Sequence, residues 1–462
     1  MIVPFFAVGQ QGKSHTVTAQ QHVNLYAERT DDKGEIAYYG TPGLILRKAF
    51  GDTPIRGWIA IDDLYYLAHR GTLYSVDNAG TAVALGTLNT IAGFVDLAYD
   101  GTLILIVDGT NLYTFTISGS TFAQVSGAFV PDGANTCTWL AGQFVVDGGT
   151  GSEQFFISPT GTAWDALDFA SAESNPDGLV RVFSDNGELV LLGVNTTEYW
   201  GNIGEADFPF QAIKGSTQEF GLASRRSLCK FNSGLAALMK TSMGQVQVMF
   251  ISGYVPKPIS TQEVDAIFND YATVSDATAY AYMLGGHPML QINFPTAAKS
   301  WLYDASTGMW SALEYGLAGA RHRGEMQLDF INKTIISDYE TGIVYTLDAD
   351  TYTDNGVAIV REIVSRHLFK GNARIPIHQL YVDMEVGIGL TSGQGVNPQV
   401  MLQISKNNGS TWGAELWREI GALGNYLQRV VWRRLGIARD WLFKLRVSDP
   451  VKVVFVFGSL DD

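Results

Sequence analysis

Short runs of alternating apolar and polar residues recur along the first three quarters of the chain. Each run is typical of a half-buried β-strand, and a turn and a second alternating strand follow it. The first strands of these hairpins are DDLYYLA (62–68), DGTLILIV (100–107), AGQFVVD (141–147), NGELVLLG (186–193), NSGLAALM (232–239), GHPMLQIN (286–293) and NKTIISD (332–338). In most copies we expect a third, outer strand, as in TAVALG (81–86), TAWDAL (162–167) and MWSALEYG (309–316).

The repeats follow one another at the spacing of propeller blades. The steps are 39, 41, 45, 46, 55 and 45 residues, measured between Leu64, Leu103, Phe144, Leu189, Leu235, Leu290 and Ile335. Such a period predicts an all-β fold, a β-propeller in which each small sheet covers its neighbours. We expect seven blades, with six as the alternative. The long step contains STQEVDAIFNDYAT (260–273), where a capping box of Ser260 and Glu263 predicts one inserted helix.

The pattern changes near residue 358. From there HQLYVDMEV, PQVMLQISK, QRVVWRRLG, WLFKLRVSD and VKVVFVFGS alternate as antiparallel strands with one solvated face do. We therefore predict an antiparallel β-sandwich, the platform domain, over residues 358–462, and a propeller over 43–357. Residues 1–42 are too few for a core and are expected to add strands to the platform. The seventh repeat lacks a clear outer strand, and GLILRKAFG (43–51) has the pattern to supply it and close the ring.

Composition agrees with a folded chain of short strands and tight turns. The sequence of 462 residues is 46% hydrophobic and 17% charged, with 50 glycines and 12% aromatic residues, which excludes a disordered chain. The longest apolar runs have strand length, and MIVPFFAVGQQGKS lacks the features of a signal peptide. We therefore expect that the protein is made in the cytoplasm and does not insert into a membrane. The two cysteines, Cys137 and Cys229, are expected to be buried free thiols.

Charge is unevenly distributed along the chain. The formal net charge is -15; residues 360–462 hold 13 Lys/Arg against 9 Asp/Glu, or +4, and the remainder holds 18 against 37, or -19. An acidic body argues against wrapping nucleic acid by phosphate neutralisation. It would suit a surface past which DNA slides without sticking.

Motifs of catalytic and metal sites are missing from the sequence. The seven histidines form no HExxH or HxH pair, and no GxSxG, P-loop or CxxC motif occurs. His322 lies near Glu325 in ARHRGE, and a lone histidine in a basic turn is interpreted as structural. We predict no enzyme activity, no metal and no cofactor.

The segment SKNNGSTW (405–412) is the strongest enzyme-like signal. It resembles the Asp-box of sialidase propellers, with Asn407 in the position of the aspartate. The resemblance implies a folding hairpin built on Asx and Ser/Thr turns, because in that family the active site lies elsewhere. Sialidase chemistry would need an arginine triad and a tyrosine nucleophile, which the sequence does not assemble.

The basic run RVVWRRLGIARDWLFKLRV (429–447) interleaves arginine with tryptophan, as nucleic-acid-binding strands do. Alternation predicts Trp432 and Arg434 on one face and Arg433 on the other. After a turn at Gly436–Asp440, Trp441, Phe443, Leu445 and Val447 are expected to share a face opposite Lys444 and Arg446. We therefore favour ion pairing of the basic side chains, within the chain or between subunits, over direct DNA contact. The candidate subunit-interface or platform residues are Trp432, Arg433, Arg434, Arg439, Lys444 and Arg446.

The same run resembles the C-terminal signature of the packaged-DNA stabilisation proteins of short-tailed lambdoid-type phages (podoviruses). That signature has a W-[KR]-R-[LV]-G strand, a short turn bearing an arginine, and an F-[KR]-[LV]-R-V strand. Further segments resemble the family in the same order: NLYAE (24–28), GTPGL (40–44), SNPDGLVRVFSDNGELVLLGVNTTEYW (174–200) and LYDASTGMW (302–310). The likeness extends from about residue 24 to 447.

The resemblance implies a structural protein of the virion tail without catalytic residues. Members form a homo-hexameric tail hub below the portal and its adaptor ring, close the DNA-filled head, retain the packaged genome and form part of the ejection channel. They dock tailspikes or tail fibres and a needle or tip, and double-stranded DNA passes through without sequence-specific binding. We expect subunit contacts and the channel in the platform, and docking on the propeller.

Two alternatives remain at this stage. One is a carbohydrate-binding or glycosidase-like β-propeller of a phage tail, suggested by the Asp-box-like turn; it requires arginine, glutamate and tyrosine converging in one pocket. The other is a DNA-binding sleeve acting through the basic strands, whose affinity would fall steeply with salt.

Overall fold

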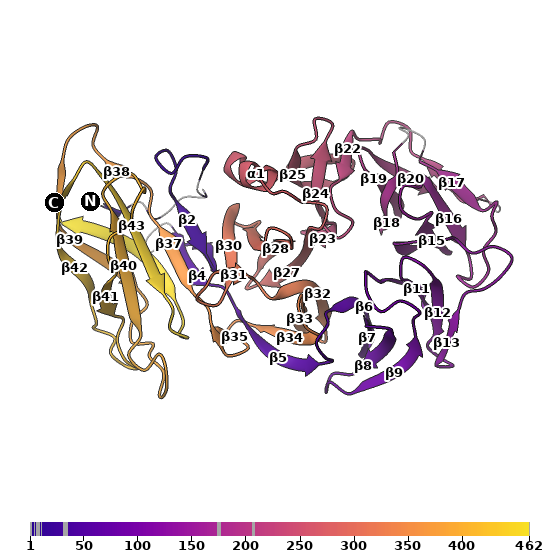
Figure 1. Cartoon of the computed structure of the whole chain (residues 1–462), viewed down its shortest axis with the longest axis horizontal. Coiled ribbons are helices and arrows are strands. Elements are labelled where there is room, and N and C mark those ends of the chain that lie inside the picture. The colour runs from indigo at the N-terminus through magenta and orange to yellow at the C-terminus, as the bar shows by residue number, and fades with distance from the viewer. Residues whose placement is uncertain are drawn as a thin grey trace.

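The computed structural model describes residues 2–3, 5, 10, 12–30, 36–172, 177–205 and 208–461. Within these ranges the chain is built of strands with a single α-helix, and no helix is long and apolar enough to cross a membrane. Figure 1 shows a ring of small sheets with a second body of strands beside it, which holds the chain terminus marked C. The first three residues of SNPDG (174–176) lie outside the described residues.

Seven sheets of the described residues surround a common centre and form the propeller (Figure 1). Blade 1 consists of β6 (Ile55–Ile61), β7 (Leu64–His69), β8 (Thr72–Val76) and β9 (Ala82–Thr87). Blade 2 consists of β10 (Asp96–Tyr99), β11 (Leu103–Val107), β12 (Leu112–Thr116) and β13 (Thr121–Gln124). Blade 3 consists of β14 (Cys137–Leu140), β15 (Gln143–Asp147), β16 (Gln154–Ser158) and β17 (Phe169–Ser171). Blade 4 consists of β18 (Leu179–Asp185), β19 (Glu188–Gly193), β20 (Thr197–Asn202) and β21 (Phe210–Ala212).

The last three blades carry additional strands. Blade 5 consists of β22 (Phe220–Leu222), β24 (Gly234–Thr241), β25 (Val246–Ser252) and β26 (Val255–Pro258), with β23 (Cys229–Phe231) also paired to β24. Blade 6 consists of β27 (Thr278–Leu284), β28 (His287–Phe294), β29 (Lys299–Asp304) and β30 (Met309–Tyr315), with β31 (Ala320–Arg321) beside β30. Blade 7 consists of β32 (Gly324–Phe330), β33 (Lys333–Asp338), β34 (Ile343–Asp348) and β5 (Gly43–Ala49), followed by β35 (Thr353–Asp354) and β36 (Val357–Ala358).

The propeller predicted from alternation is confirmed. Each predicted hairpin core falls on the second strand of a blade, where both faces are covered by neighbouring blades, as in β11 with all five residues buried. The first strand of each blade was missed; β14, for example, has four residues and a burial pattern without alternation. The outer strand predicted at TAWDAL is wrong: blade 3 ends on β17, and Trp164 instead caps a turn by donating its indole N–H to the Gly161 carbonyl oxygen at 3.0 Å.

The inserted helix is present, but its N-cap residue is one position later than predicted. The helix α1 spans Gln262–Asn269, and its N-cap is Thr261, whose hydroxyl accepts from the Val264 amide. The hydroxyl of Ser260 accepts instead from the Val248 amide of β25, at 3.1 Å. The predicted capping box is therefore wrong, because the Ser260 hydroxyl bonds to blade 5 and does not cap the helix.

Blade 7 is completed by a strand from the start of the chain. The strand β5 pairs antiparallel with β34, from Gly43 opposite Asp348 to Ala49 opposite Ile343. Gly43 permits this arrangement, since a Cβ there would lie 2.4 Å from the Thr353 carbonyl oxygen. Segments about 300 residues apart in sequence are thus held in one sheet, which resists opening of the ring.

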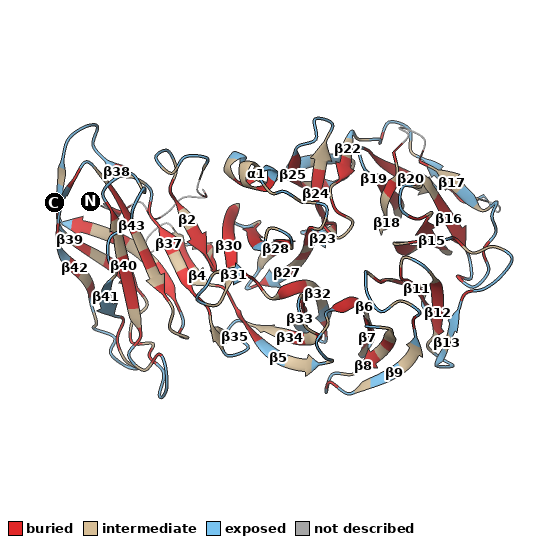
Figure 2. Ribbon diagram, viewed as in Figure 1, coloured by how far each residue is buried: buried red, intermediate tan, exposed pale blue. Residues whose placement is uncertain are grey.

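The platform consists of two sheets around one core. The first contains β3 (Leu25–Arg29), β4 (Ile36–Gly40), β44 (Val454–Asp461), β39 (Ile375–Met384) and β42 (Val430–Ala438), with β1 (Ile2–Val3) beside β44. The second contains β2 (Gln21–Val23), β37 (Arg361–Val364), β43 (Asp440–Val447), β40 (Gln399–Ser405) and β41 (Leu416–Glu419), with β38 (Leu368–Phe369) beside β43. Figure 2 shows buried residues along the strands of both bodies and exposed residues mainly in the loops. The predicted β-sandwich is confirmed.

The propeller and the platform share a sheet. The strand β2 pairs with β30 of blade 6 on one side and with β37 of the platform on the other, so blade 6 continues into the second platform sheet. Val23 lies opposite both Ala312 and Glu362 in this arrangement. The two bodies are therefore joined by backbone hydrogen bonds and not by linkers alone.

A buried arginine lies at the same junction. Arg361 is fully buried, and its guanidinium donates to the carbonyl oxygens of Ile359, Val451 and Thr41 at 3.4–3.5 Å. Desolvation lowers the pKa of Arg361 to about 10. The carboxyl of Asp354 interacts with it electrostatically and is itself 2% exposed. One buried cation thus contacts both segments in which the chain crosses between the propeller and the platform, at Thr41 and Ile359, and a platform loop at Val451.

Candidate functional site

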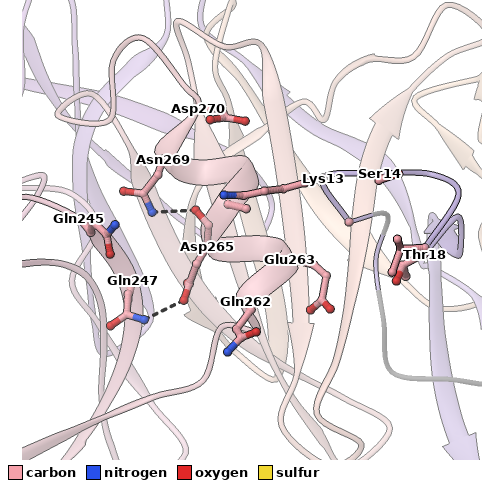
Figure 3. Close-up of a pocket in the computed structure, with 13 residues that line it drawn as sticks. Lys13, Ser14, Thr18, Gln245, Gln247, Gln262, Glu263, Asp265, Asn269 and Asp270 are labelled. Atoms are coloured by element: carbon pink, nitrogen blue, oxygen red, sulfur yellow. Dashed lines mark hydrogen bonds between the residues drawn. The ribbon is translucent and has the colours of Figure 1, made fainter.

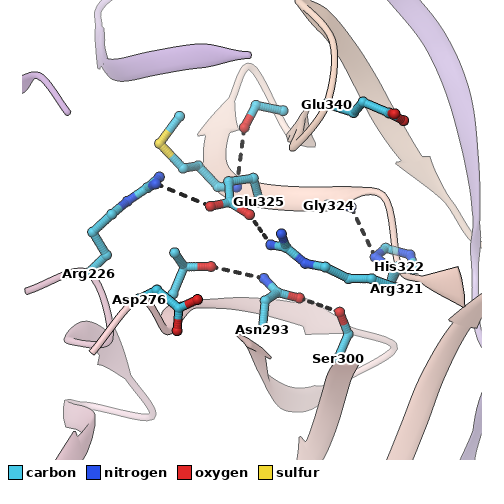
Figure 4. Close-up of polar contacts among 12 residues, drawn as sticks. Arg226, Asp276, Asn293, Ser300, Arg321, His322, Gly324, Glu325 and Glu340 are labelled. Carbon is cyan, nitrogen blue, oxygen red and sulfur yellow. Dashed lines mark hydrogen bonds and ion pairs between the residues drawn. The ribbon is translucent and has the colours of Figure 1, made fainter. Parts of the chain in front are cut away.

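Charged side chains from non-adjacent blades meet inside the propeller. Glu325, at the start of β32, pairs with Arg321 and, at 3.1 Å, with Arg226 of blade 5 (Figure 4). The guanidinium of Arg226 also stacks 3.3 Å from the ring centroid of Phe94, which precedes blade 2. Burial lowers the pKa of Arg226 to about 10, with Glu325 acting against this shift. The cluster therefore braces blades 2, 5 and 7 against one another.

A second set of contacts extends this brace to blade 4. Arg181 of β18 donates to the Arg225 carbonyl oxygen at 2.9 Å, and its guanidinium lies 3.9 Å from the Asp96 carboxylate of β10. Arg225 in turn donates to the Val180 carbonyl oxygen at 3.1 Å. Arg181 and Asp96 line a cavity of about 320 Å³ together with Arg226 and Glu325. These ion pairs and hydrogen bonds link blades 2, 4, 5 and 7 across the propeller interior.

Arginine, glutamate and tyrosine do converge near this cavity, as a sugar-binding or sugar-cleaving site would require. Tyr280 lines the cavity but is only 4% exposed, and its hydroxyl lies 2.2 Å from where a Cβ on Gly324 would be. Burial raises the pKa of Tyr280 well above its ordinary value, which opposes formation of a nucleophilic phenolate. Arg226 and Arg321 are both engaged by Glu325. Among the described residues that line the cavity two are arginines, Arg181 and Arg226, where a sialidase would need three.

The other chemistry-bearing residues of the propeller are also engaged by the fold. His322 is 7% exposed, its Nδ1 accepts from the Gly324 amide at 3.1 Å (Figure 4), and burial lowers its pKa to about 4, so it is neutral at pH 7. Cys137 is buried, whereas Cys229, expected to be buried, is half-buried. Desolvation raises the pKa of Cys229 to about 12. Among the described residues no group of three His, Cys, Asp or Glu side chains could hold a metal ion.

A polar cleft of about 590 Å³ separates the loop near residue 14 from α1 (Figure 3). Its helix side presents Asp265 and Asn269, but both serve the fold: Asp265 accepts from Gln247 at 2.7 Å, and Asn269 donates to the Asp265 carbonyl oxygen at 2.7 Å. Lys13 belongs to the loop on the other side, and its side chain extends toward α1 (Figure 3). The described lining contains no aromatic side chain on which a sugar ring could stack, so this cleft offers little for carbohydrate.

The Asp-box-like turn lies in the platform, at the end of β40. The side-chain oxygen of Asn407 accepts from the Thr411 amide at 3.0 Å and from the Ser405 hydroxyl at 2.9 Å. Asn408 adopts a left-handed conformation with φ of 58°. These are the contacts of a folding turn, and Trp412 at its end lies half-buried under the Lys444 ammonium, which is 4.6 Å from the ring centroid.

The basic strands do not alternate as predicted. Trp432 is 1% exposed and donates its indole N–H to the Leu416 carbonyl oxygen at 2.8 Å, so it is a core residue of the platform. A bulge follows, because Ile377 pairs with Gly436 while Gln379 pairs with Arg433. The assignment of Arg433 and Arg434 to opposite faces is wrong: Arg434 takes a φ of 61°, and both arginines are exposed.

The predicted turn at Gly436–Asp440 is also wrong, because β42 continues to Ala438 and only the exposed Arg439 separates it from β43. Beyond it the prediction is confirmed. Trp441, Phe443, Leu445 and Val447 are all buried. On the opposite face the Lys444 ammonium pairs with the Glu362 carboxylate of β37 at 3.3 Å, and Arg446 lies directly opposite Glu362.

The basic side chains of β42 have different partners from those of β43. Arg433 donates to the side-chain oxygen of Gln379 at 3.1 Å. In the part of the chain that the structure describes, neither Arg433 nor Arg434 has an acidic partner within 4 Å. Both line a cleft of about 590 Å³ together with Lys406, which the sequence pattern did not single out. The bulge brings these three cations together, and the hydrophobic pattern carries no signal for it.

Family models match both bodies of this chain. The β-propeller of bacteriophage P22 Gp10 matches residues 3–352, and the β-sandwich of bacteriophage P22 Gp10 matches residues 360–460. The "Tail hub protein gp10" of Salmonella phage P22 is 26% identical over 290 residues, which is 60% of this chain. The match covers 58% of the length of that relative.

Solved structures show weaker similarity. The extracellular domain of the putative hybrid two component system BT4673 from B. thetaiotaomicron aligns with a TM-score of 0.46 and 10% identity, over 78% of this chain and 45% of that one. YCF48 bound to D1 peptide aligns with a TM-score of 0.43 and 13% identity, over 70% and 98% of the two chains. Similarity at this level does not establish a shared function.

Proposed function

The chain belongs to the bacteriophage P22 Gp10 family, and from this membership we propose that it is a structural tail hub protein of a phage virion. The observation that carries the proposal is the match of both family domains, in order, over residues 3–352 and 360–460. The relative named as a tail hub protein supports the same role. The chain is then a component of the virion tail, assembled in the host cytoplasm.

More specifically, we propose that six copies of the chain form a ring below the portal and its adaptor. The ring closes the DNA-filled head, retains the genome, and forms part of the channel through which DNA leaves. The brace between Arg226 and Glu325 inside the propeller supports a DNA path between copies and not through the propeller of one copy. The charge of -19 outside residues 360–462 supports a body past which DNA slides.

We propose docking of tail fibres, tailspikes or a needle on the propeller, and subunit contacts on the platform. The shared sheet of β30, β2 and β37 supports this division, because it holds the propeller rigidly against the platform. A catalytic step is not part of the proposal. The arginine and glutamate side chains that a glycosidase would use are engaged by one another in the propeller core.

The test is the mass in solution of the full chain, measured by light scattering behind a sizing column, alone and mixed with a portal–adaptor complex. We expect six copies on the complex. The portal without its adaptor serves as the control and should recruit fewer copies. A chain that stays monomeric and ignores the complex would overturn the proposal, and a glycan screen would then test the carbohydrate-binding alternative. The DNA-sleeve alternative predicts binding to double-stranded DNA that weakens steeply between about 50 and 200 mM salt.

A further inference from the structure

The cleft beside the bulge of β42 has the chemistry of a carboxylate site. Its volume is about 590 Å³, and it opens between the turn after β40 and the Arg433–Leu435 segment. The three cationic side chains that line it are Lys406, Arg433 and Arg434. We call it the β40–β42 cleft.

Two of these cations are fixed by the fold with their charge uncompensated. The Lys406 ammonium donates to the Leu435 carbonyl oxygen at 2.7 Å and lies 4.8 Å from the Trp441 ring centroid. Arg433 is held by the Gln379 side-chain oxygen, at 3.1 Å. Both partners are neutral. Within the described residues no carboxylate lies within 4 Å of any of the three cations.

The third cation occupies a strained position. Arg434 has a φ of 61°, a conformation that costs an ordinary side chain about 1 kcal/mol or more and that glycine or asparagine would adopt more readily. The bulge turns its side chain out to solvent beside that of Arg433. Two adjacent guanidinium groups on one exposed face can bind a carboxylate through charge-assisted hydrogen bonds.

Part of the lining of the cleft is apolar. Ile404, Trp412 and Leu416 line it, and the neighbouring side chains of Trp417 and Ile437 are 50% and 51% exposed. Exposed tryptophan and aliphatic side chains around arginines are typical of protein interfaces. Because its cations lie beside apolar side chains, the cleft suits a carboxylate on an aliphatic stem better than it suits the continuous phosphate backbone of DNA.

We propose that the β40–β42 cleft receives an acidic side chain of a second copy of this chain, so that Arg433 and Arg434 join neighbours in the ring. This inference rests on the proposed tail hub function, which places copies side by side. Charge complementarity supports a second copy as the occupant, because the residues outside 360–462 carry -19. The contact is heterologous, with the cleft of one copy facing a different surface of the next, as closure of a ring requires.

Charge reversal is the first test. The double variant Arg433→Glu/Arg434→Glu should weaken ring assembly on the portal–adaptor complex by at least about tenfold in apparent affinity. The matched control is Lys370→Glu/Arg374→Glu, which reverses two exposed charges of the platform away from the cleft. Arg433→Lys/Arg434→Lys keeps the charge and should retain most of the assembly. Circular dichroism and the melting temperature verify folding of each variant.

Cross-linking identifies the occupant. In rings made from equal amounts of ¹⁴N- and ¹⁵N-labelled Arg434→Lys chains, a zero-length carbodiimide should join the new amine to an Asp or Glu of the other isotope. Reversal variants that assemble as well as the control, or cross-links confined to one isotope, would overturn the inference while leaving the tail hub function intact. Reversal that spares assembly but reduces the salt dependence of DNA binding would also overturn it, in favour of DNA. Failure of the unmodified chain to assemble would instead refute the tail hub function.

Discussion

Replacing Asp354 by asparagine should remove a pH dependence of stability that the junction imposes on the protein. The carboxyl is 2% exposed, and burial raises its pKa from 3.8 to about 7 although Arg361 opposes the shift. The folded protein therefore binds a proton that the unfolded chain releases between pH 4 and 7. The stabilisation is fully present below pH 4 and is lost as the pH rises through 7.

The magnitude follows from the two pKa values. Each pH unit between them lowers the free energy of unfolding by about 1.4 kcal/mol, so between pH 5 and 8 this group contributes a loss of about 2.5 kcal/mol. Urea unfolding followed by tryptophan fluorescence at pH 5 and pH 8 measures the loss for the unmodified protein and for Asp354→Asn. Other titrating groups affect both proteins equally, so the difference isolates Asp354.

The matched control is Asp350→Asn, because Asp350 is an exposed carboxyl of the same segment. It should lose stability between pH 5 and 8 as the unmodified protein does. If Asp354→Asn shows the same loss as the unmodified protein, to within about 0.5 kcal/mol, then Asp354 is ionised in the folded state and the argument from its burial is refuted.

Three further predictions concern the propeller. Glu325→Gln should lower the free energy of unfolding by about 3–5 kcal/mol, since it leaves the buried Arg321 and the half-buried Arg226 without their carboxylate. Glu340→Gln, at an exposed pair, should cost under about 1 kcal/mol, and equal effects in urea unfolding would contradict the brace. Gly57→Ala should cost at least about 2 kcal/mol, because its Cβ would lie 1.8 Å from the Val95 carbonyl oxygen, whereas Gly201→Ala, with 3.6 Å of space, is the control in thermal unfolding. Both cysteines should react slowly with a thiol reagent at pH 8 and fully in urea, because burial raises the pKa of each thiol; rapid labelling of the folded protein would contradict this.

Short apolar runs that recur at blade spacing were sufficient to predict the second strand of every blade. The run LILIV at 103–107 is an example, since both of its faces are covered and all five residues are buried. A resemblance carried by short motifs also led to the correct family. The first strands of the blades were missed, although β27 (TAYAYML) alternates between buried and more exposed residues.

The hydrophobic pattern of the sequence could not predict contacts between distant segments or local backbone strain. Arg226 and Glu325 are 99 residues apart, and nothing in either local sequence indicates that they meet. The bulge at Arg434 depends on a positive φ at an ordinary residue, which a hydrophobic pattern cannot encode. As a result the two exposed arginines were assigned to opposite faces, and the cleft they line with Lys406 was not predicted.

The sheet shared by the two bodies determines how the protein can be divided. A propeller fragment of residues 43–357 would lose β2 and leave one edge of β30 with unpaired amide and carbonyl groups. A fragment of residues 358–462 would likewise lose β2 and expose the edge of β37, and open edges of this kind pair with other chains and aggregate. A propeller or platform fragment that includes residues 21–23 should therefore aggregate more slowly than the same fragment without them. The propeller and the platform can be separated in the sequence, but each needs the same three-residue strand to cover its edge.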